Sequence, residues 1–408
     1  MKVLKIKDIV RTISITHKFD KDKLIAINTS DVENGIMHDG TLTAIEDLKG
    51  QFKKTVQKGD ILFSEIRPAN RRFALVTKDD CADYVVSTKL MVLRKYNNEV
   101  DLRYFYYCLT NQPFLDMLQR KAENRIGSFP QITFDLLSEY AFPVPSLSEQ
   151  EKIANIIFSL DHKIELNKQI NDNLEAMAKQ LYDYWFVQFD FPNEEGKPYK
   201  SSGGAMVWNE KLKREIPEGW NVANIFDELF VQYGFPFSTE LFTEEPTSIP
   251  VVRIRDILEN SVSAYSEEEV DEKYKLQKQD LLVGMDGNFH MNYWNDNVSY
   301  LNQRSVRLRA KSKSTVSIMQ AKYDIAPYIK AKELRAKGST VGHLSDKDLK
   351  ELFVLVNPNA DFRNKFDSIL ADIIENRCEM IELTKQRDEL LPLLMNGQAS
   401  VNYHLSDD

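Results

Sequence analysis

The 408-residue sequence contains only three cysteines, Cys81, Cys108 and Cys378, and they are widely spaced. An odd number of scattered thiols argues against a disulfide-stabilised secreted fold, so we expect reduced cysteines. No segment approaches the roughly 18 consecutive apolar residues of a membrane helix, and the N-terminus has no apolar run of signal-peptide type. These absences predict a cytoplasmic protein that does not interact with a membrane.

The sequence also lacks the motifs of the common catalytic sites. Its six histidines form no pair at the helical spacing that binds a metal. A Gly-x-Ser-x-Gly elbow, a phosphate-binding loop and a Gly-x-Gly-x-x-Gly fingerprint are all missing. The sequence therefore predicts a chain that is not an enzyme and binds neither a metal nor a cofactor.

Most of the net charge of −9 lies on two segments of helical composition. Residues 148–200 carry 6 basic and 10 acidic residues, and residues 346–408 carry 7 and 13. Residues 1–147 carry 22 and 19. Because a local basic cluster can bind phosphate whatever the total charge, nucleic-acid binding is not excluded.

An internal repeat is the most informative feature that is present. Residues 164–169, Ile-Glu-Leu-Asn-Lys-Gln, return at 381–386 as Ile-Glu-Leu-Thr-Lys-Gln. The offset of 217 residues is too long for a solenoid, so it predicts two copies of a globular module, each followed by a long helix. We expect the two hexapeptides to mark the same point on the two helices.

The predicted modules, residues 1–147 and 216–357, are rich in short β segments separated by turns. Residues 56–62, Val-Gln-Lys-Gly-Asp-Ile-Leu, match 276–282, Leu-Gln-Lys-Gln-Asp-Leu-Leu. In module one, apolar and aromatic residues at helical spacing predict one helix over 103–119. Residues 188–215 are polar and contain Ser-Ser-Gly-Gly, which predicts a linker, and 398–408 form a tail.

Two heptad patterns predict the long helices, over residues 148–187 and 358–397. Apolar residues at spacings of four and three form a seam on each helix, interrupted by asparagines that can fix the register. We expect the helices to pack antiparallel on each other. The predicted seam residues are Ile153, Ile157, Leu160, Ile164, Asn167, Asn171, Leu174, Leu181, Phe366, Ile369, Ile373, Asn376, Met380, Leu383 and Leu390.

A loop in each module has the composition of a nucleic-acid contact. Residues 65–73 bring Arg67, Asn70, Arg71 and Arg72 together after an apolar segment. Arginine reads guanine with two hydrogen bonds and asparagine reads adenine, so such a loop can both bind phosphate and read bases. A solvated basic turn explains the composition equally well.

The corresponding region of module two, residues 284–294, combines glycines with amide and aromatic side chains. We consider Asp286, Asn288, His290 and Asn292 as candidates for DNA binding there, and Arg304 from a basic stretch further on. One turn in each module places a cation near a hydroxyl at matching positions. Such a turn could bind a phosphate, or it could be an ordinary tight turn. These candidates are Arg125, Ser128, Lys337 and Ser339.

With these features in this order, the chain resembles the specificity subunits of type I restriction–modification systems. The resemblance covers almost the whole chain. It rests on Phe-Pro-Val-Pro-Ser at 142–146 leading into a helix, Ile-Pro-Glu-Gly-Trp at 216–220, and the segment Leu-Leu-Pro-Leu-Leu-Met-Asn-Gly at 390–397. Module two departs from module one in two places: Gln279 stands where module one has Gly59, and residues 355–358 lack the Pro-x-Pro of module one.

The resemblance implies an α+β fold with two similar mixed α/β target-recognition domains. Two long antiparallel coiled-coil helices would join them with pseudo-twofold symmetry. Each domain would read one half of a split, asymmetric site in double-stranded DNA. This chain would be non-catalytic and would have two modification subunits as partners on its helices.

Those modification subunits would bind S-adenosylmethionine and methylate adenine. A restriction subunit, an ATP-dependent translocase and nuclease, can join such a complex. The alternative that the composition leaves open is a coiled-coil scaffold whose two globular domains bind other proteins. The acidic total charge favours this scaffold slightly, whereas the arginine-rich loop favours DNA recognition.

Overall fold

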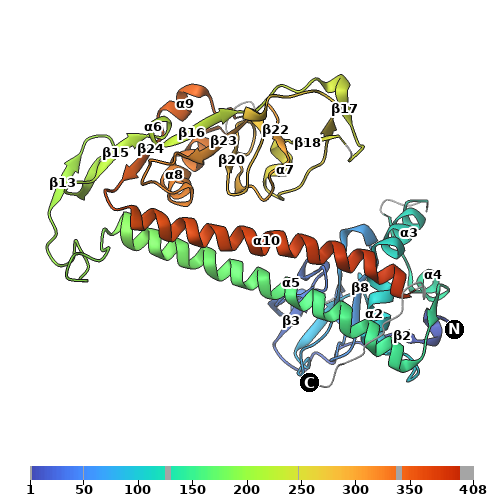
Figure 1. The fold of residues 1–408 in the computed structure, drawn as a ribbon. Helices are drawn as coiled ribbons and strands as arrows, with labels where there is room; N and C mark the ends of the chain where they lie inside the picture. The colour runs from blue at the N-terminus through green and yellow to red at the C-terminus, as the bar shows by residue number, and fades with distance from the viewer. Residues whose placement is uncertain (1, 49, 125–129, 247, 337–341, 396–408) are drawn as a thin grey trace, which may run out of the picture. The chain divides into compact units, whose positions relative to one another are not determined.

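The computed structural model divides the chain into two compact units (Figure 1). Unit 1 comprises Met1–Lys163 and Glu382–Asp408, and unit 2 comprises Ile164–Ile381. The structure describes residues 2–48, 50–124, 130–246, 248–336 and 342–395. In these ranges, no helix has both the length and the apolar character needed to cross a membrane.

Unit 1 is built on two four-stranded sheets and smaller strand pairs. Its strands are β1 (Lys2–Lys5), β2 (Val10–Thr12), β3 (Lys23–Ile27), β4 (Val32–Glu33), β5 (Ile36–Met37), β6 (Thr41–Ala44), β7 (Phe52–Lys54), β8 (Ile61–Ser64), β9 (Phe73–Leu75), β10 (Tyr84–Ser87), β11 (Leu90–Lys95) and β12 (Ala141–Val144). One sheet has the order β2-β11-β8-β9 and is antiparallel throughout. The other has the order β6-β3-β10-β7, with β10 parallel to β3, and β1 pairs with β12.

The single helix predicted over 103–119 is wrong, because the structure has two helices there. They are α2 (Leu102–Thr110) and α3 (Gln112–Glu123), with short helices α1 (Ile45–Leu48) and α4 (Phe134–Ser138) elsewhere in the unit. Asn111 between them is extended and caps α3 by accepting a hydrogen bond from the backbone N–H of Phe114. Pro113 has no N–H to continue the first helix, so the chain begins a new one.

Unit 2 repeats this plan with its own strands and helices. The strands are β13 (Met206–Asn209), β14 (Arg214–Pro217), β15 (Asn221–Asn224), β16 (Leu229–Tyr233), β17 (Phe242–Thr243), β18 (Ile249–Val252), β19 (Tyr265–Ser266), β20 (Leu281–Gly284), β21 (Met291–Tyr293), β22 (Tyr300–Leu301), β23 (Ser305–Ala310) and β24 (Phe353–Val356). The antiparallel sheet has the order β16-β23-β20-β21, and the second sheet has the order β17-β19-β18-β22, with β18 parallel to β22. The helices are α6 (Ile225–Glu228), α7 (Ile254–Ile257), α8 (Ile318–Ala336) and α9 (Asp346–Lys350).

The central strands β8 and β20 are buried on both faces, which explains why both sequences are continuously apolar. Ile61 and Phe63 belong to one hydrophobic cluster of unit 1, and Leu62 between them belongs to another. In unit 2, Leu281 and Leu282 divide between two clusters in the same way. Since side chains alternate along a strand, each central strand joins the two layers of its unit.

The predicted match between residues 56–62 and 276–282 is confirmed by a buried ion pair in each unit. In unit 1, Arg94 donates from Nε and Nη2 to the two carboxylate oxygens of Asp60, at 2.7 Å each. In unit 2, Arg309 donates to Asp280 at 2.6 and 2.7 Å through the same atoms. Each carboxylate also accepts a backbone N–H three residues earlier, from Gln57 or Gln277.

The presence of Gln279 where module one has Gly59 has a structural consequence. Gly59 and Gln279 both have left-handed backbone, with φ of 87° and 73°. A Cβ in this conformation costs roughly 1–2 kcal/mol, whereas glycine adopts it freely. Unit 2 therefore contains local strain that unit 1 avoids.

Replacing Gln279 with glycine is expected to raise the free energy of unfolding of unit 2 by about 0.5–1 kcal/mol. This net value is the strain that is relieved minus the stability lost because glycine has more conformational entropy in the unfolded chain. All four tryptophans, Trp185, Trp208, Trp220 and Trp294, lie in unit 2, so tryptophan fluorescence during urea unfolding measures this change. The matched control, Gly59→Ala, should destabilise unit 1 by a similar amount, seen by circular dichroism. Unfolding of the Gln279→Gly variant at a lower urea concentration than the parent would show that Gln279 is not strained.

The two predicted long helices are confirmed as α5 (Leu147–Tyr182), which continues as a π-helical turn over Asp183–Val187, and α10 (Ala360–Met395). They run antiparallel where they meet in each unit. In unit 1, Arg387 donates to Asp161 at 2.9 Å. In unit 2, Asn171 accepts a hydrogen bond from Asn376 at 2.9 Å and donates to the carbonyl of Ile373 at 3.2 Å.

The predicted seam residues face the interior to different degrees. Fully buried are Ile153, Ile157, Asn167, Asn171, Phe366, Ile369, Ile373 and Leu383. Half-buried are Leu160, Ile164, Leu174, Leu181, Asn376, Met380 and Leu390. The two buried asparagines are satisfied within unit 2, because Asn167 donates to Glu379 at 2.6 Å and Asn171 bonds across to α10. Their polar contacts fix the register of the helix pair.

The hexapeptide repeat does not mark equivalent points on the two helices, contrary to our expectation. Both helices have 36 residues, and their starts are 213 residues apart, whereas the hexapeptides are 217 apart. The faces differ accordingly: Leu166 is exposed and its counterpart Leu383 is buried. The side chains of the two copies therefore differ in which of them face the interior.

The linker predicted over 188–215 is only partly a connection. Phe189 and Phe191 are buried in the core of unit 2, where both rings pack against Trp220. β13 and β14 form an antiparallel hairpin at its end. The apolar side chains, which the polar composition of the segment masks, tie it to the unit.

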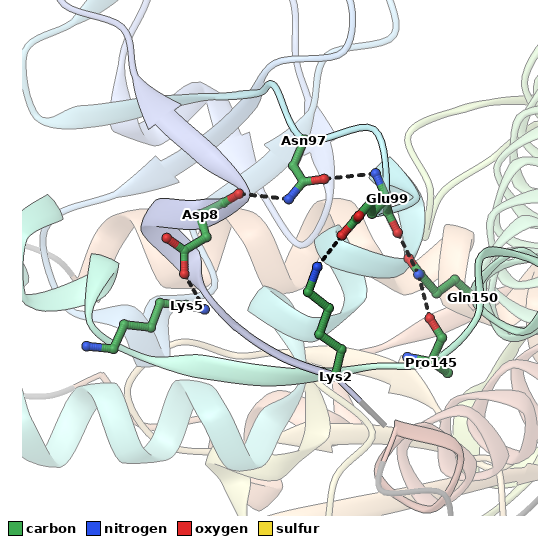
Figure 2. A network of polar contacts seen from close by, with 7 residues as sticks. All are labelled: Lys2, Lys5, Asp8, Asn97, Glu99, Pro145 and Gln150. Atoms are coloured by element: carbon green, nitrogen blue, oxygen red, sulfur yellow. Dashed lines mark hydrogen bonds and ion pairs between the residues drawn. The ribbon is translucent and has the colours of Figure 1, made fainter.

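The first turn of α5 is anchored to module one by a buried glutamine (Figure 2). The helix begins one residue earlier than predicted, because Ser146 and Glu149 cap it reciprocally. Gln150 donates from Nε2 to the carbonyls of Glu99 and Pro145, both at 2.9 Å, and accepts from the N–H of Asp101. Its side-chain hydrogen bonds with Glu99 and Asp101 hold the helix start against the loop after β11.

Candidate nucleic-acid interface

The loops predicted to contact DNA occupy equivalent places in the two units. Residues 65–72 connect β8 to β9, and residues 285–290 connect β20 to β21. Each loop forms an isolated β-bridge with a later segment, Ile66 with Gln131 and Asp286 with His343. The candidate surfaces of both units are therefore built by the same two segments of each module.

Backbone hydrogen bonds repeat at these loops almost bond for bond. The N–H of Glu65 donates to the carbonyl of Lys89, and the N–H of Met285 donates to the carbonyl of Arg304. The N–H of Arg67 donates to Pro130, and that of Gly287 donates to Gly342. Rigid backbone of this kind can position side chains for recognition without large rearrangement.

The loop of unit 1 has unusual backbone geometry. Arg67 and Arg71 have left-handed backbone, with φ of 47° and 54°, on either side of a 3-10 turn over Pro68–Asn70. Such conformations are unfavourable for non-glycine residues and cluster at functional sites. The side chains of Arg67 and Asn70 are exposed on this turn.

The other two arginines of this loop bind neighbouring groups of unit 1. Arg71 donates to Asn34 at 2.8 Å and to Gln112 at 2.5 Å, and its guanidinium lies 5.5 Å from the centre of the Phe73 ring. Burial lowers the pKa of Arg71, and the charge of Arg387 lowers it further. Arg72 donates to the carbonyl of Ser30 at 3.2 Å. Arg71 therefore stabilises the loop rather than projecting from it.

In unit 2, the loop residue Asp286 contacts a histidine and an arginine from other segments. The Asp286 carboxylate is 2.5 Å from Nδ1 of His343 and 3.6 Å from Nε of Arg304. Arg304 has left-handed backbone, with φ of 67°, and its side chain is 61% exposed. Asp286 thus approaches the guanidinium of Arg304 from its Nε side.

Arg304 lines an open hollow of about 570 Å³ on unit 2. Cationic and amide groups dominate its lining, which suits phosphates and base edges. The hollow unites three predicted residues, Asn288, His290 and Arg304, with five that the sequence analysis missed. The missed residues are Arg253, Ile254, Arg255, Asn302 and Gln303.

Asn292 is the one candidate of this loop region whose amide is used inside unit 2. Its Nδ2 donates to the carbonyl of Leu258 at 2.8 Å, and its Oδ1 accepts from Arg377 at 3.1 Å. Arg377 lies on α10, so Asn292 connects β21 to the long helix. Reading a base would require these contacts to break.

Four candidates, Arg125, Ser128, Lys337 and Ser339, lie outside the described residues. Elsewhere in the chain, among the residues that the structure describes, no group of three or more His, Cys, Asp or Glu side chains could hold a metal ion. The hollow of unit 2 offers cations and amides to a ligand.

Comparison with known proteins identifies the family. The model of the type I restriction modification DNA specificity domain matches residues 1–176 and 217–392, which is most of the chain. The chain belongs to this family. Its two matches start at equivalent places in the two modules, in agreement with the repeated plan of the units.

The relatives of this specificity-domain chain are specificity subunits. It is 44% identical over 184 residues to the type I restriction enzyme HindI specificity subunit of Haemophilus influenzae, covering 45% of this chain and 40% of that protein. It is 27% identical over 312 residues to the MjaIX specificity subunit of Methanocaldococcus jannaschii, covering 73% and 69%. The match thus spans less than half the length of the first relative and about two thirds of the second.

A solved structure shows the same fold. The type I restriction–modification S subunit from M. genitalium aligns over 97% of this chain and 96% of that one, with a TM-score of 0.58 and 16% identity. At this identity the likeness supports the fold of the specificity-domain chain and not its individual contacts.

Two of the residues that we missed are exposed in the hollow of unit 2. Arg255, 68% exposed, lies on α7 directly after β18, and Gln303 is exposed beside Arg304. The only signal in the sequence was the position of Arg255 just after an apolar segment. Because β18 and the β22–β23 turn meet only through sheet pairing, their proximity could not be predicted from local spacing.

Proposed function

We propose that this chain is the DNA-recognition subunit of a type I restriction–modification complex, and that each module reads one half of a bipartite site. The hollow of unit 2 is the main support, because exposed arginine and amide side chains converge there on rigid backbone. Unit 1 presents Arg67 and Asn70 from the equivalent loop. A scaffold that binds proteins has no need for this concentration of base-reading side chains.

The chain itself is proposed to be non-catalytic. In this proposal, two modification subunits dock on the long helices, bind S-adenosylmethionine and methylate adenine, and a restriction subunit can join them in the cytoplasm. Exposed apolar residues along α5 and its π-helical continuation in unit 2 support docking of a partner helix. Leu166, Ile170, Met177 and Tyr184 follow each other at spacings of four, seven and seven, which places them on one side of the helix.

The proposal is tested by DNA binding with the modification subunits present. We expect the affinity for a specific duplex to fall steeply with salt, because bound cations release counterions from the phosphates. The modification subunits without this chain serve as the control and should bind without sequence preference. Equal binding in both cases would instead favour the scaffold.

A variant in unit 1 tests the assignment of modules to half-sites. Replacing Asn70 or Arg67 with alanine is expected to relax the sequence requirement in one half-site and to leave the other unchanged. Arg71→Ala should in addition lower the stability of unit 1, since its guanidinium has internal partners. Methylome sequencing of a host that expresses each variant complex gives the motif directly. If Asn70→Ala altered both half-sites, the assignment of one module to one half-site would be wrong.

A further inference from the structure

Three side chains of unit 2 follow one another in series: His343, Asp286 and Arg304, of which Arg304 lines the hollow. His343 and Asp286 are joined by a hydrogen bond between side chains and by a β-bridge between backbones. The backbone carbonyl of Arg304 accepts from Met285, next to Asp286. Both ends of the series are therefore fixed to the same strand end.

This arrangement leaves the Nη atoms of the Arg304 guanidinium available to a ligand. Asp286 approaches Arg304 at Nε, and among the described residues no hydrogen bond or ion pair involves its two Nη atoms. Neighbouring arginines differ in this respect. Arg309 uses Nε and Nη2 on Asp280, and Arg307 is buried and donates from Nη1 to the carbonyls of Lys273 and Lys275.

We propose that Arg304 reads a guanine in the half-site of unit 2 and that Asp286 and His343 are positioning residues that orient its guanidinium. The inference rests on the proposed function and names one base pair of its target. Guanine presents N7 and O6 in the major groove, and two parallel N–H groups of an arginine match them. A carboxylate at Nε restrains rotation of the guanidinium, so less side-chain entropy is lost on binding.

In the described part of unit 1, the matching places do not carry such a series, which makes the inference specific to one half-site. The residues at the matching places are Ile66, Lys89 and Gln131. Isoleucine cannot accept a hydrogen bond, and a lysine ammonium is a point charge that does not form the bidentate pattern. The two modules therefore read their half-sites by different chemistry at equivalent positions.

The test is the methylation motif of the full complex, with this chain and its modification subunits expressed together. Arg304→Ala is expected to make one base pair of the unit 2 half-site degenerate, with roughly a 10- to 100-fold loss of preference for guanine. Arg304→Lys should lose most of the same preference although it keeps the charge. Arg304→Asn suits left-handed backbone and keeps the fold if alanine does not. Lys278→Ala, an exposed cation before β20, is the matched control and should leave the motif unchanged.

The positioning role of Asp286 is tested by its effect on the same base pair of the motif. Asp286→Asn should reduce the preference at the same base pair by a smaller factor and affect no other position, whereas a general loss of structure would weaken all positions together. Tryptophan fluorescence verifies folding of each variant. The inference is overturned if Arg304→Ala keeps the wild-type motif, or weakens methylation of all sequences equally, as loss of a phosphate contact would. A wild-type complex that methylates no defined motif would overturn the proposed function itself.

Discussion

Replacing Asp280 with alanine is expected to lower the free energy of unfolding of unit 2 by about 3 kcal/mol. Asp280 is 2% exposed, and its carboxylate accepts both from Arg309 and from the backbone N–H of Gln277. The variant leaves a guanidinium that is 28% exposed without its counter-charge and a backbone donor without its acceptor. Urea unfolding monitored by tryptophan fluorescence measures the loss, and Trp294 lies close to the site because its backbone N–H donates to the carbonyl of Asp280.

The repeated plan supplies matched controls for this experiment. Asp60→Ala removes the equivalent pair from unit 1, where Asp60 is fully buried and Arg94 is 18% exposed, so an equal or larger loss is expected there. Glu210→Ala removes an ion pair with Lys213 in which both side chains are exposed, and it should cost under about 0.5 kcal/mol. A loss below about 1 kcal/mol for Asp280→Ala would show that the buried pair contributes little beyond its own desolvation cost.

The general organisation of the chain could be predicted because it depends on local patterns. Heptad spacing predicted α5 and α10, and the match of 56–62 with 276–282 located the strands β8 and β20. Breaks within a helix were harder to predict. The helix over 103–119 is divided because Pro113 cannot continue it, although the apolar spacing is the same on both sides.

The hexapeptide shows why a clear repeat can mislead. A heptad sequence resembles itself after each turn or two, so copies on different turns align well. Packing separates the two copies, because Leu166 of the first is exposed and its counterpart Leu383 is buried.

The candidate site could be predicted only in part, because its members come from distant segments. The two predicted loops lie between equivalent strands of the units, but the composition could not show which side chains have internal partners. Arg71 and Asn292 resemble reading residues in the sequence, yet both are bonded within their units. Arg255 and Gln303 reach the hollow through pairing of β18 with β22, which local spacing does not reveal.

Lengthening both long helices by one heptad is expected to lengthen the untouched gap in the recognition motif by about three base pairs. Duplicating residues 168–174 in α5 and 373–379 in α10 adds seven residues, or roughly 10 Å, to each helix. DNA rises about 3.4 Å per base pair along its axis. The duplication repeats both Asn171 and Asn376, which bond to each other, so the added heptads keep an asparagine opposite an asparagine.

The motif obtained by methylome sequencing decides the outcome, because both half-sites should stay the same while only the gap changes. Three base pairs also turn the DNA by roughly 100°, whereas a heptad shifts a helix face by only about 20°, so slower methylation is expected along with the longer gap. Duplicating the heptad in α5 alone is the control. It leaves the second asparagine without a partner on α10 and should abolish methylation rather than change the gap. An unchanged gap in the double duplication would mean that the helices do not set the spacing of the half-sites.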